Sequence, residues 1–247
     1  MNQMKIVLIT FFLCLSAGVS AQSWLPDTAG TGCQLVKHEG YVLLYDEYHE
    51  QARWVAYMLT RERVHGTVPR KGNDRFLPDT TVRSGSALPE DYSGSGYDRG
   101  HLAPAADMKW SQRTMRESFL MSNISPQDHA FNEGIWCRAE ELVRRWAEEY
   151  DTIYVITGPV LEGELQQFRG RGGNVISIPE RFFKVVYDPK RKQAIGLLME
   201  NRNVKRPLQS FAVSVEEVKR ATGIEFLNEN DNENEKEKGV CISCWKW

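Results

Sequence analysis

The 247-residue sequence lacks the patterns that mark several common classes of protein. Beyond one N-terminal stretch, no apolar run approaches the ~20 residues that a membrane-spanning helix needs. Histidine and cysteine occur five times each, no His-Glu-x-x-His segment is present, and Cys241 and Cys244 alone make at most half of a zinc site. There is no internal repeat, and the net charge of −2 excludes a generally basic coat for nucleic acid. One globular domain with a local binding or catalytic site remains.

The N-terminal residues have the pattern of a signal peptide. Lys5 precedes an apolar run over residues 6–15, and small or compact residues follow up to Ala21. A membrane anchor is the alternative, but the run is shorter than a membrane span. We therefore expect residues 1–21 to be removed, leaving a secreted or periplasmic protein with no membrane segment.

Charge is distributed unevenly along the chain. Residues 225–238 contain six acids and only two lysines. Basic residues gather on both sides of residue 100: Arg61, Arg63, Arg70, Lys71, Arg75, Lys109, Arg113 and Arg116. A local basic groove is therefore compatible with the near-neutral total, and an ordinary mixed surface is the alternative.

The periodicity of apolar residues predicts an α+β fold with a mixed, largely antiparallel central sheet. We expect strands at 41–45, 52–59, 119–124, 153–157, 182–187 and 194–199, and helices at 135–150 and 214–223. Ser214 and Glu217 form a capping box for the last helix, and Gly223 ends it. Residues 22–227 are expected to form one domain. Residues 228–247 are expected to be a low-complexity acidic segment with a cysteine-containing C-terminus, dispensable for activity.

The most informative segment is Tyr97-Asp98-Arg99-Gly100-His101, which follows a Gly-Ser stretch. His101 could act as a general base near neutral pH, and Arg99 could neutralise phosphate charge. Gly100 would let the backbone approach a bulky anion. These residue types are common in turns and a lone histidine is usually structural, so the segment needs support from elsewhere in the chain.

That support comes from three later segments: Ser122-Asn123-Ile124, Phe131-Asn132-Glu133-Gly134 and Ala139-Glu140-Glu141. Together with Trp54-Val55-Ala56-Tyr57, Thr157-Gly158-Pro159 and Pro179-Glu180-Arg181-Phe182-Phe183-Lys184-Val185, they make the sequence similar to the DNA/RNA non-specific endonuclease family over most of residues 40–227. The resemblance implies a ββα-metal (His-Me finger) motif, and the predicted order of strand, loop, strand and helix agrees with it.

The resemblance also implies a role for each matching residue. His101 would be the general base that activates water, Arg99 would bind phosphate, and Asn132 would be the direct protein ligand of one Mg²⁺ or Mn²⁺ ion. Glu140 follows Asn132 by eight residues, ~12 Å of helix rise, so it would reach the metal through water. The alternatives are that Asn132 is a helix N-cap and that Glu140, like its neighbour Glu141, is surface charge.

Three further residues are assigned from their positions near this motif. Asn123 is expected to support the histidine or the substrate, and Arg70 is a candidate for a second phosphate-binding arginine. Asp98 is expected to hold the local fold or to orient Arg99. The resulting hypothesis is an exported, Mg²⁺-dependent endonuclease that cleaves DNA and RNA to 5′-phosphate products, with homodimers known in the family. The alternative is a nuclease fold that has lost catalysis and only binds nucleic acid.

Four cysteines follow residue 21: Cys33, Cys137, Cys241 and Cys244. An even number in an exported protein favours two disulfides. Because Cys137 lies off the apolar stripe of the predicted helix, we expect it to pair with a C-terminal cysteine and Cys33 to take the other. A free, packed Cys137 is the alternative.

Overall fold

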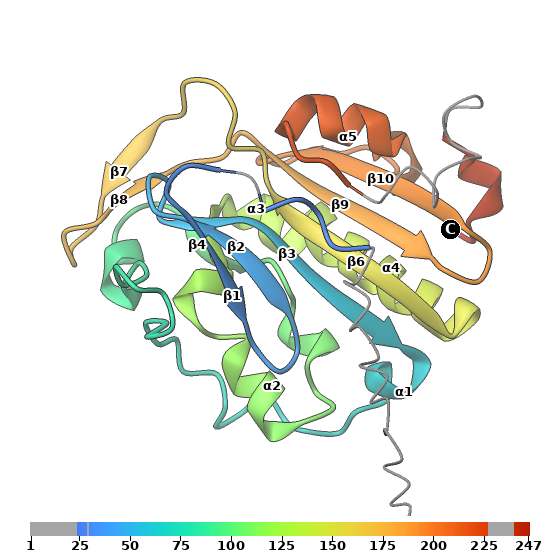
Figure 1. Ribbon diagram of the computed structural model, residues 1–247, viewed down its shortest axis with the longest axis horizontal. Helices are drawn as coiled ribbons and strands as arrows, with labels where there is room; N and C mark the ends of the chain where they lie inside the picture. Colours follow the sequence, from blue (N-terminus) through green and yellow to red (C-terminus); the bar gives the residue numbers. More distant parts are fainter. Residues whose placement is uncertain (1–23, 29, 227–239) are drawn as a thin grey trace, which may run out of the picture.

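The computed structural model describes residues 24–28, 30–226 and 240–247 (Figure 1). The expected signal peptide and most of the expected low-complexity segment lie outside these residues. The helices are α1 (Arg61–Val64), α2 (Gln112–Glu117), α3 (His129–Phe131), α4 (Cys137–Tyr150) and α5 (Val215–Thr222). The strands are β1 (Cys33–Lys37), β2 (Val42–Asp46), β3 (Gln51–Thr60), β4 (Asp98–His101), β5 (Ile124–Gln127), β6 (Thr152–Pro159), β7 (Gln167–Arg169), β8 (Val175–Ser177), β9 (Arg181–Asp188), β10 (Gln193–Glu200) and β11 (Ala212–Val213). Within the described ranges, no helix has the length and apolar character to cross a membrane.

A seven-stranded sheet forms the centre of the molecule, in the order β1-β2-β3-β6-β9-β10-β11. Each neighbouring pair in it is antiparallel. Two small hairpin-like pairs, β4–β5 and β7–β8, lie outside this sheet. The predicted α+β class with a largely antiparallel sheet is therefore confirmed.

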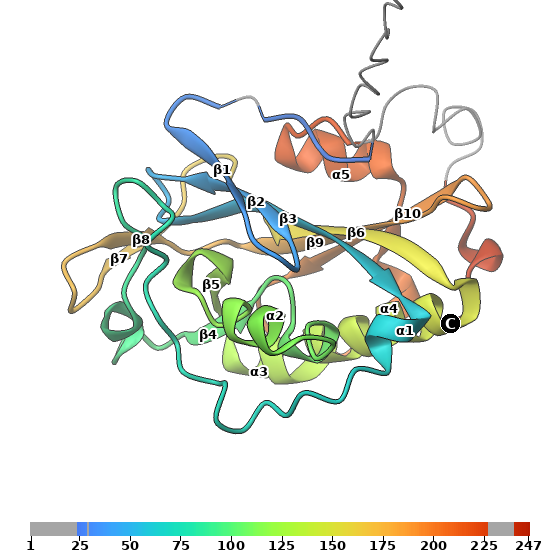
Figure 2. The same ribbon diagram turned by 60° about the horizontal axis from the view of Figure 1, so that its bottom comes forward.

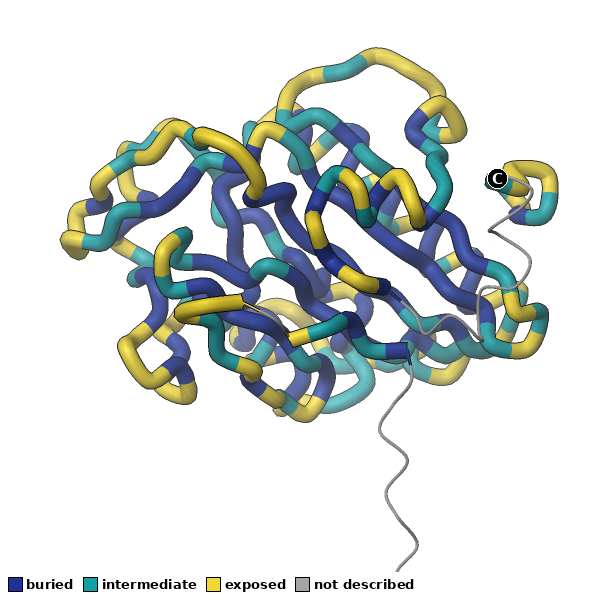
Figure 3. Tube along the Cα trace, turned by 45° about the horizontal axis from the view of Figure 1, so that its top comes forward, coloured by how far each residue is buried: buried dark blue, intermediate teal, exposed yellow. Residues whose placement is uncertain are grey.

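Helices cover both faces of the sheet. Figure 2 shows α5 on one face and α4, with the shorter α1, α2 and α3, on the other. Alternation along β3 explains this layering, because Val55 and Tyr57 belong to the core beneath α4 whereas Trp54 and Ala56 belong to the core beneath α5. The central strands are accordingly buried, and exposure is concentrated in the connections (Figure 3). The sheet thus gives α4 a rigid base.

Most predicted elements are present, including α5 with its Ser214–Glu217 capping box and Gly223 at a φ of 65°. The strand predicted at 119–124 is wrong. Residues Met121–Asn123 form a 3₁₀ turn, and β5 begins only at Ile124. The Asn123 amide group donates to the carbonyl of Ser118, and its backbone N–H donates to Leu120, so this apolar segment is buried as a turn.

The predicted cysteine pairing is also wrong. Cys241 is bonded to Cys244, while Cys33 and Cys137 are free thiols. The C-terminal residues dock at the far end of α4, where the Trp245 ring packs against the Trp146 ring at a tilt of 55°, with 4.6 Å between ring centroids. Cys137 begins the same helix, nine residues or roughly 13 Å of helix rise from Trp146. The tail therefore lies too far along the helix for the predicted bond.

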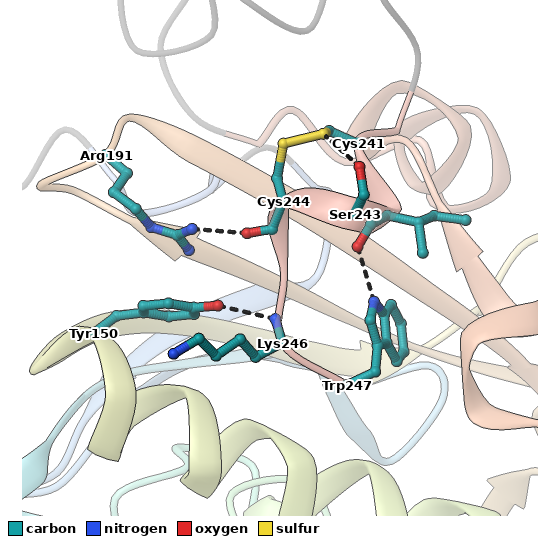
Figure 4. The surroundings of a disulfide bond; sticks show 8 residues. Tyr150, Arg191, Cys241, Ser243, Cys244, Lys246 and Trp247 are labelled. Carbon is teal, nitrogen blue, oxygen red and sulfur yellow. Dashed lines mark hydrogen bonds between the residues drawn. A yellow bond between two sulfur atoms is a disulfide. The ribbon is translucent and has the colours of Figure 1, made fainter.

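Residues 240–247 form an ordered part of the fold. Figure 4 shows Tyr150 accepting a hydrogen bond from the backbone N–H of Lys246, and Arg191 donating to the carbonyl of Cys244. The indole N–H of Trp146 donates to the carbonyl of Lys246, and Trp245 is only 3% exposed. The last eight residues therefore pack against α4, and the dispensability of residues 228–247 for activity stays a prediction.

Trp245→Ala should lower the free energy of unfolding by about 3–5 kcal/mol, because it removes a buried indole from the surface of α4. Ile242→Ala is the matched control, since Ile242 is 37% exposed and should change stability by less than ~1 kcal/mol. Urea unfolding followed by circular dichroism measures both. Equal stabilities for the wild type and Trp245→Ala would contradict the docking.

Candidate active site

The segment around His101 and the helix bearing Asn132 are brought together by the pairing of β4 with β5. His101 lies opposite Ile124 and Gly100 opposite Ser125 in this pair. After β5 the chain turns directly into α3 and α4, completing a strand–loop–strand–helix unit. A Cβ atom on Gly100 would lie 2.2 Å from the Gln127 side chain. Close packing within the pair therefore requires this glycine, and its expected part in the approach to an anion stays a prediction.

A cleft of about 680 Å³ opens beside this unit. It is lined by five of the seven residues to which the sequence analysis gave a role, the exceptions being Asn123 and Asp98, and by several others, notably Lys109, Cys137 and Arg144. The five are Arg70, Arg99, His101, Asn132 and Glu140. The fold thus brings together side chains separated by up to 70 positions along the chain, on one concave surface.

Two phenylalanines form the floor on which the basic side chains rest. Phe76 and Phe119 meet edge to face at 5.3 Å, and the His101 ring packs edge-on against Phe119 at 4.8 Å. The guanidinium of Arg99 lies 4.9 Å from the Phe76 ring centroid, and that of Arg70 lies 5.3 Å from the Phe119 ring centroid. Cation–π contacts of this kind orient arginines without neutralising them. No pattern in the sequence indicates these contacts with Phe76, which lines the cleft, and with Phe119, which is buried behind it.

His101 is held as a neutral imidazole. Burial is the main cause that lowers its pKa to about 3, and the positive charge of Arg70 adds to the effect. Its Nε2 atom is buried and has no hydrogen-bond partner among the described residues. The backbone is fixed from the other side, where the Trp136 indole N–H donates to the His101 carbonyl at 3.2 Å. A buried, unpartnered ring nitrogen is suited to accept a proton.

Asn132 is oriented by Asp98. The Asn132 Nδ2 group donates to Asp98 Oδ2 at 2.9 Å, and His129 Nδ1 contacts the same oxygen at 3.0 Å. A carboxylate only accepts hydrogen bonds, so the amide nitrogen must face Asp98, leaving the Asn132 Oδ1 atom without a partner among the described residues. Asp98 therefore holds the local fold, one of its two expected roles, and the residue that it orients is Asn132 and not Arg99. The helix N-cap is Asp128, and Asn132 lies in the π-helical turn Asn132–Trp136, so the alternative N-cap role of Asn132 is wrong.

Glu140 faces the cleft, whereas Glu141 is exposed and does not line it. Burial is the main cause that raises the pKa of Glu140 to about 7, and the charge of Lys184 acts in the opposite direction. Lys184 is itself buried, 3.8 Å from the Trp136 ring centroid, and burial lowers its pKa to about 8. Beside them, Arg144 pairs with buried Asp107 at 2.9 Å. The side of α4 that faces the cleft is thus supported by a buried charge network.

Sequence reasoning missed this network. The signal was present for Lys184, because a lysine within the apolar run 182–187 is unusual on a buried strand. No comparable signal existed for Asp107, whose partners Tyr57 and Arg144 come from β3 and α4. Such contacts between distant segments do not appear as a local pattern.

Asn123 does not line the cleft. It is fully buried, and its amide bonds both the N–H and the carbonyl of Ala103. The contact fixes the backbone two residues beyond His101, so Asn123 supports the histidine through the chain and does not face substrate.

The arginines that line the cleft differ from those that precede it. Arg70 and Arg99 form no ion pair within the described ranges. Arg61, Arg63 and Arg99 donate to the backbone carbonyls of Glu148, Met58 and Pro89, respectively. Position therefore divides the basic cluster, because Arg70 and Arg99 line the cleft whereas Arg61 and Arg63 do not.

Glu140→Ala should reduce nuclease activity by about 10–100-fold, the usual effect of removing a group that orients a metal's surroundings. Glu141→Ala, at the adjacent exposed position, should stay within about twofold of the wild type. Initial rates on plasmid DNA at saturating Mg²⁺ measure both. A larger loss of activity in Glu141→Ala than in Glu140→Ala would contradict a catalytic role for the α4 side chain that faces the cleft.

A ββα unit that presents a neutral imidazole, unpaired arginines and a free amide oxygen to one cleft defines the class of ββα-metal nucleases. Comparison with known proteins agrees. The family model for DNA/RNA non-specific endonucleases matches residues 24–233. Human mitochondrial endonuclease G is 35% identical over 222 residues, covering 85% of this chain and 73% of that protein. Nuclease C1 of Cunninghamella echinulata var. echinulata is 33% identical, covering 87% and 91% respectively.

Among solved structures, the crystal structure of an EndoG/EndoGI complex aligns with a TM-score of 0.68 and 30% identity. The alignment covers 78% of this chain and 84% of the matched one. The chain therefore belongs to the DNA/RNA non-specific endonuclease family, and it is a metal-dependent endonuclease.

Proposed function

We propose that this protein is a Mg²⁺-dependent endonuclease that cleaves DNA and RNA without sequence preference and leaves 5′-phosphate ends. The observation that carries the proposal is the buried, unpartnered Nε2 atom of neutral His101, in the same cleft as the free Oδ1 atom of Asn132. In this arrangement His101 takes a proton from water as the water attacks phosphorus. Arg70 and Arg99 bind the phosphate oxygens.

The residues present fit a hard cation. Asn132 and Glu140 supply oxygen atoms, which Mg²⁺ and Mn²⁺ prefer, and no group of three His, Cys, Asp or Glu residues forms a metal site elsewhere in the described part. Asn132 would hold the ion directly, and Glu140 would do so through water. The ion would supply stabilisation of the charge that develops on the phosphate and on the departing 3′-oxygen. Asp98 acts one step away by fixing the Asn132 amide.

Low sequence preference is expected from the chemistry of the cleft. The charged residues that line the cleft bind phosphate groups, and phosphate groups carry no direct sequence information. The same reasoning predicts that DNA and RNA are both substrates.

We also propose that this protein is exported from the cell that produces it. The names of several relatives describe mitochondrial proteins. For this chain, we propose cleavage after residue 21, a nuclease domain over residues 22–227, and a secreted or periplasmic location. The Cys241–Cys244 disulfide supports an oxidising compartment. We also propose that this protein forms homodimers. N-terminal sequencing of protein from the producing cells tests the cleavage position, and sedimentation tests the assembly.

The purified protein should degrade plasmid DNA and RNA when Mg²⁺ is present, and a chelator should abolish the activity. End-labelling with and without phosphatase identifies the 5′-phosphate. Binding to DNA without cleavage at any concentration of Mg²⁺ or Mn²⁺ would instead support the alternative, a fold that has lost catalysis.

Cleavage should weaken steeply with salt. If Arg70, Arg99 and Lys109 neutralise phosphates, binding releases counterions, and the logarithm of kcat/KM should fall linearly with the logarithm of salt concentration. Rates between 50 and 300 mM NaCl, at fixed Mg²⁺, measure the slope. A flat profile would mean that phosphate charge contributes little to binding.

A further inference from the structure

We propose that a single-stranded segment of nucleic acid that leaves the cleft is bound by a second surface, beside the β7–β8 hairpin. This hairpin surface consists of Tyr97, Phe168, Arg169 and Arg171. The inference rests on the proposed nuclease function and extends it, because it predicts that substrates are held by more than the cleft.

Contacts with the body of the protein hold the β7–β8 hairpin in one position. It projects at one end of the molecule (Figures 1 and 2), with Phe168 opposite Ile176 in the β7–β8 pair. A Cβ atom on Gly170 would lie 2.3 Å from the Cβ of Asp91, so the turn lies directly against residues 89–92. Asn174 Nδ2 donates to Asp91 Oδ2 at 2.8 Å and holds the turn there. The turn is therefore fixed against the body of the protein.

A pair of aromatic rings connects the hairpin to the catalytic segment. The rings of Tyr97 and Phe168 are nearly parallel, at 16°, with centroids 6.2 Å apart, and both residues are half-buried. Buried Tyr92 supports Phe168 from its edge, at 5.9 Å. Partly exposed aromatic rings beside a basic groove are the surfaces on which unpaired bases stack.

This pair continues the line of the cleft. Tyr97 immediately precedes β4, and alternate residues of an extended segment share a face, which places Tyr97 in one row with Arg99 and His101. Arg99 and His101 both contact Phe76 in the cleft. The row from His101 to Tyr97 spans roughly 13 Å, at about 3.3 Å per residue of extended chain. A strand cleaved at His101 would reach the ring pair within a few nucleotides.

The charges beyond the ring pair suit phosphate. Arg169 and Arg171 are exposed, and neither forms an ion pair with a described residue. Arg169 Nη1 donates to the carbonyl of Gly173 at 2.8 Å, which holds its side chain across the turn. Residues 89–92 form a short 3₁₀ helix with two acids beside the hairpin. Asp91 is buried and its Oδ2 atom accepts hydrogen bonds from Leu88 and Asn174, so Glu90 is the exposed acid of this helix. Two unpaired arginines beside an aromatic pair match the backbone and bases of a single strand.

The test measures binding without cleavage, by fluorescence anisotropy in EDTA with labelled single strands of 24 nucleotides and of 2 nucleotides, the shorter being unable to span the cleft and the hairpin surface together. The Arg169→Ala/Arg171→Ala variant should bind the longer strand at least ~5-fold more weakly and reduce the salt slope by about 1.4, at about 0.7 per phosphate contact. Binding of the shorter strand should stay within about twofold. Phe168→Leu keeps an apolar side chain in the hairpin but removes the ring, and it should weaken binding of the longer strand about 5-fold or more.

Arg220→Ala is the matched control, because Arg220 is an exposed arginine on α5, across the sheet from the cleft. It should bind both strands as the wild type does. Three outcomes would contradict the proposed hairpin surface. The double arginine variant could bind the longer strand as tightly as Arg220→Ala does, or its affinity for both strands could fall equally. The third outcome is a wild type that binds both strands with the same affinity. Plasmid cleavage with Mg²⁺ is measured separately. Hairpin-dependent binding without cleavage would overturn only the proposed function, and cleavage with normal binding by the variants would overturn only the hairpin surface.

Discussion

His101→Ala should lower kcat by at least ~10²-fold while leaving DNA binding largely intact, because it removes the one ring nitrogen in the cleft placed to take a proton from water. Arg70 and Arg99 remain, so KM should change much less than kcat. Steady-state rates at pH 7.5 separate the two constants. His65→Ala is the matched control, since His65 is an exposed histidine at the end of α1 and should retain full activity.

The variant also permits a check that does not depend on catalysis. The pKa of His101 is lowered to about 3, whereas an unfolded histidine has a pKa near 6.5. Between these values the unfolded chain binds a proton that the folded chain does not, so His101 makes the wild type lose stability as the pH falls below about 6.5. His101→Ala should lose less stability than the wild type over that range. Full activity of His101→Ala at neutral pH would overturn the general-base role.

Asn132→Ala should reduce activity by roughly 10²–10³-fold at ordinary Mg²⁺ concentrations and should raise the concentration of Mg²⁺ needed for half-maximal rate. The reason is that its Oδ1 atom is the amide oxygen that Asp98 leaves free in the cleft. A Mg²⁺ titration of the cleavage rate measures both effects. Asn203→Ala, at an exposed asparagine, provides the matched control.

Asp98→Ala distinguishes the effect of the Asn132 amide oxygen as a metal ligand from the effect of its orientation by Asp98. It keeps the Asn132 oxygen but removes the carboxylate that fixes the amide, so its loss of activity should be smaller than that of Asn132→Ala and should be partly overcome by higher Mg²⁺. An unchanged Mg²⁺ requirement in Asn132→Ala would assign the metal to other residues.

The sequence by itself determined the parts of this protein that depend on local pattern. Runs rich in β-branched and aromatic residues predicted the central strands, and the capping box with Gly223 predicted α5. The resemblance to the endonuclease family also pointed to His101, Arg99, Asn132 and Glu140, which the fold brings to one cleft. The same resemblance favoured Glu140 over its neighbour Glu141, and of the two only Glu140 lines the cleft.

The tertiary structure alone decided which distant groups meet. Asp98 bonds Asn132 across 34 positions of the chain, and Lys184 from β9 lies beside the α4 residues of the site. The docking of Trp245 on Trp146 keeps the last cysteines away from Cys137, so they bond to each other. The physical reason is that periodicity and capping depend on neighbours within a few residues. The partner of a buried charge or thiol depends on how whole elements pack, and no local pattern records that packing.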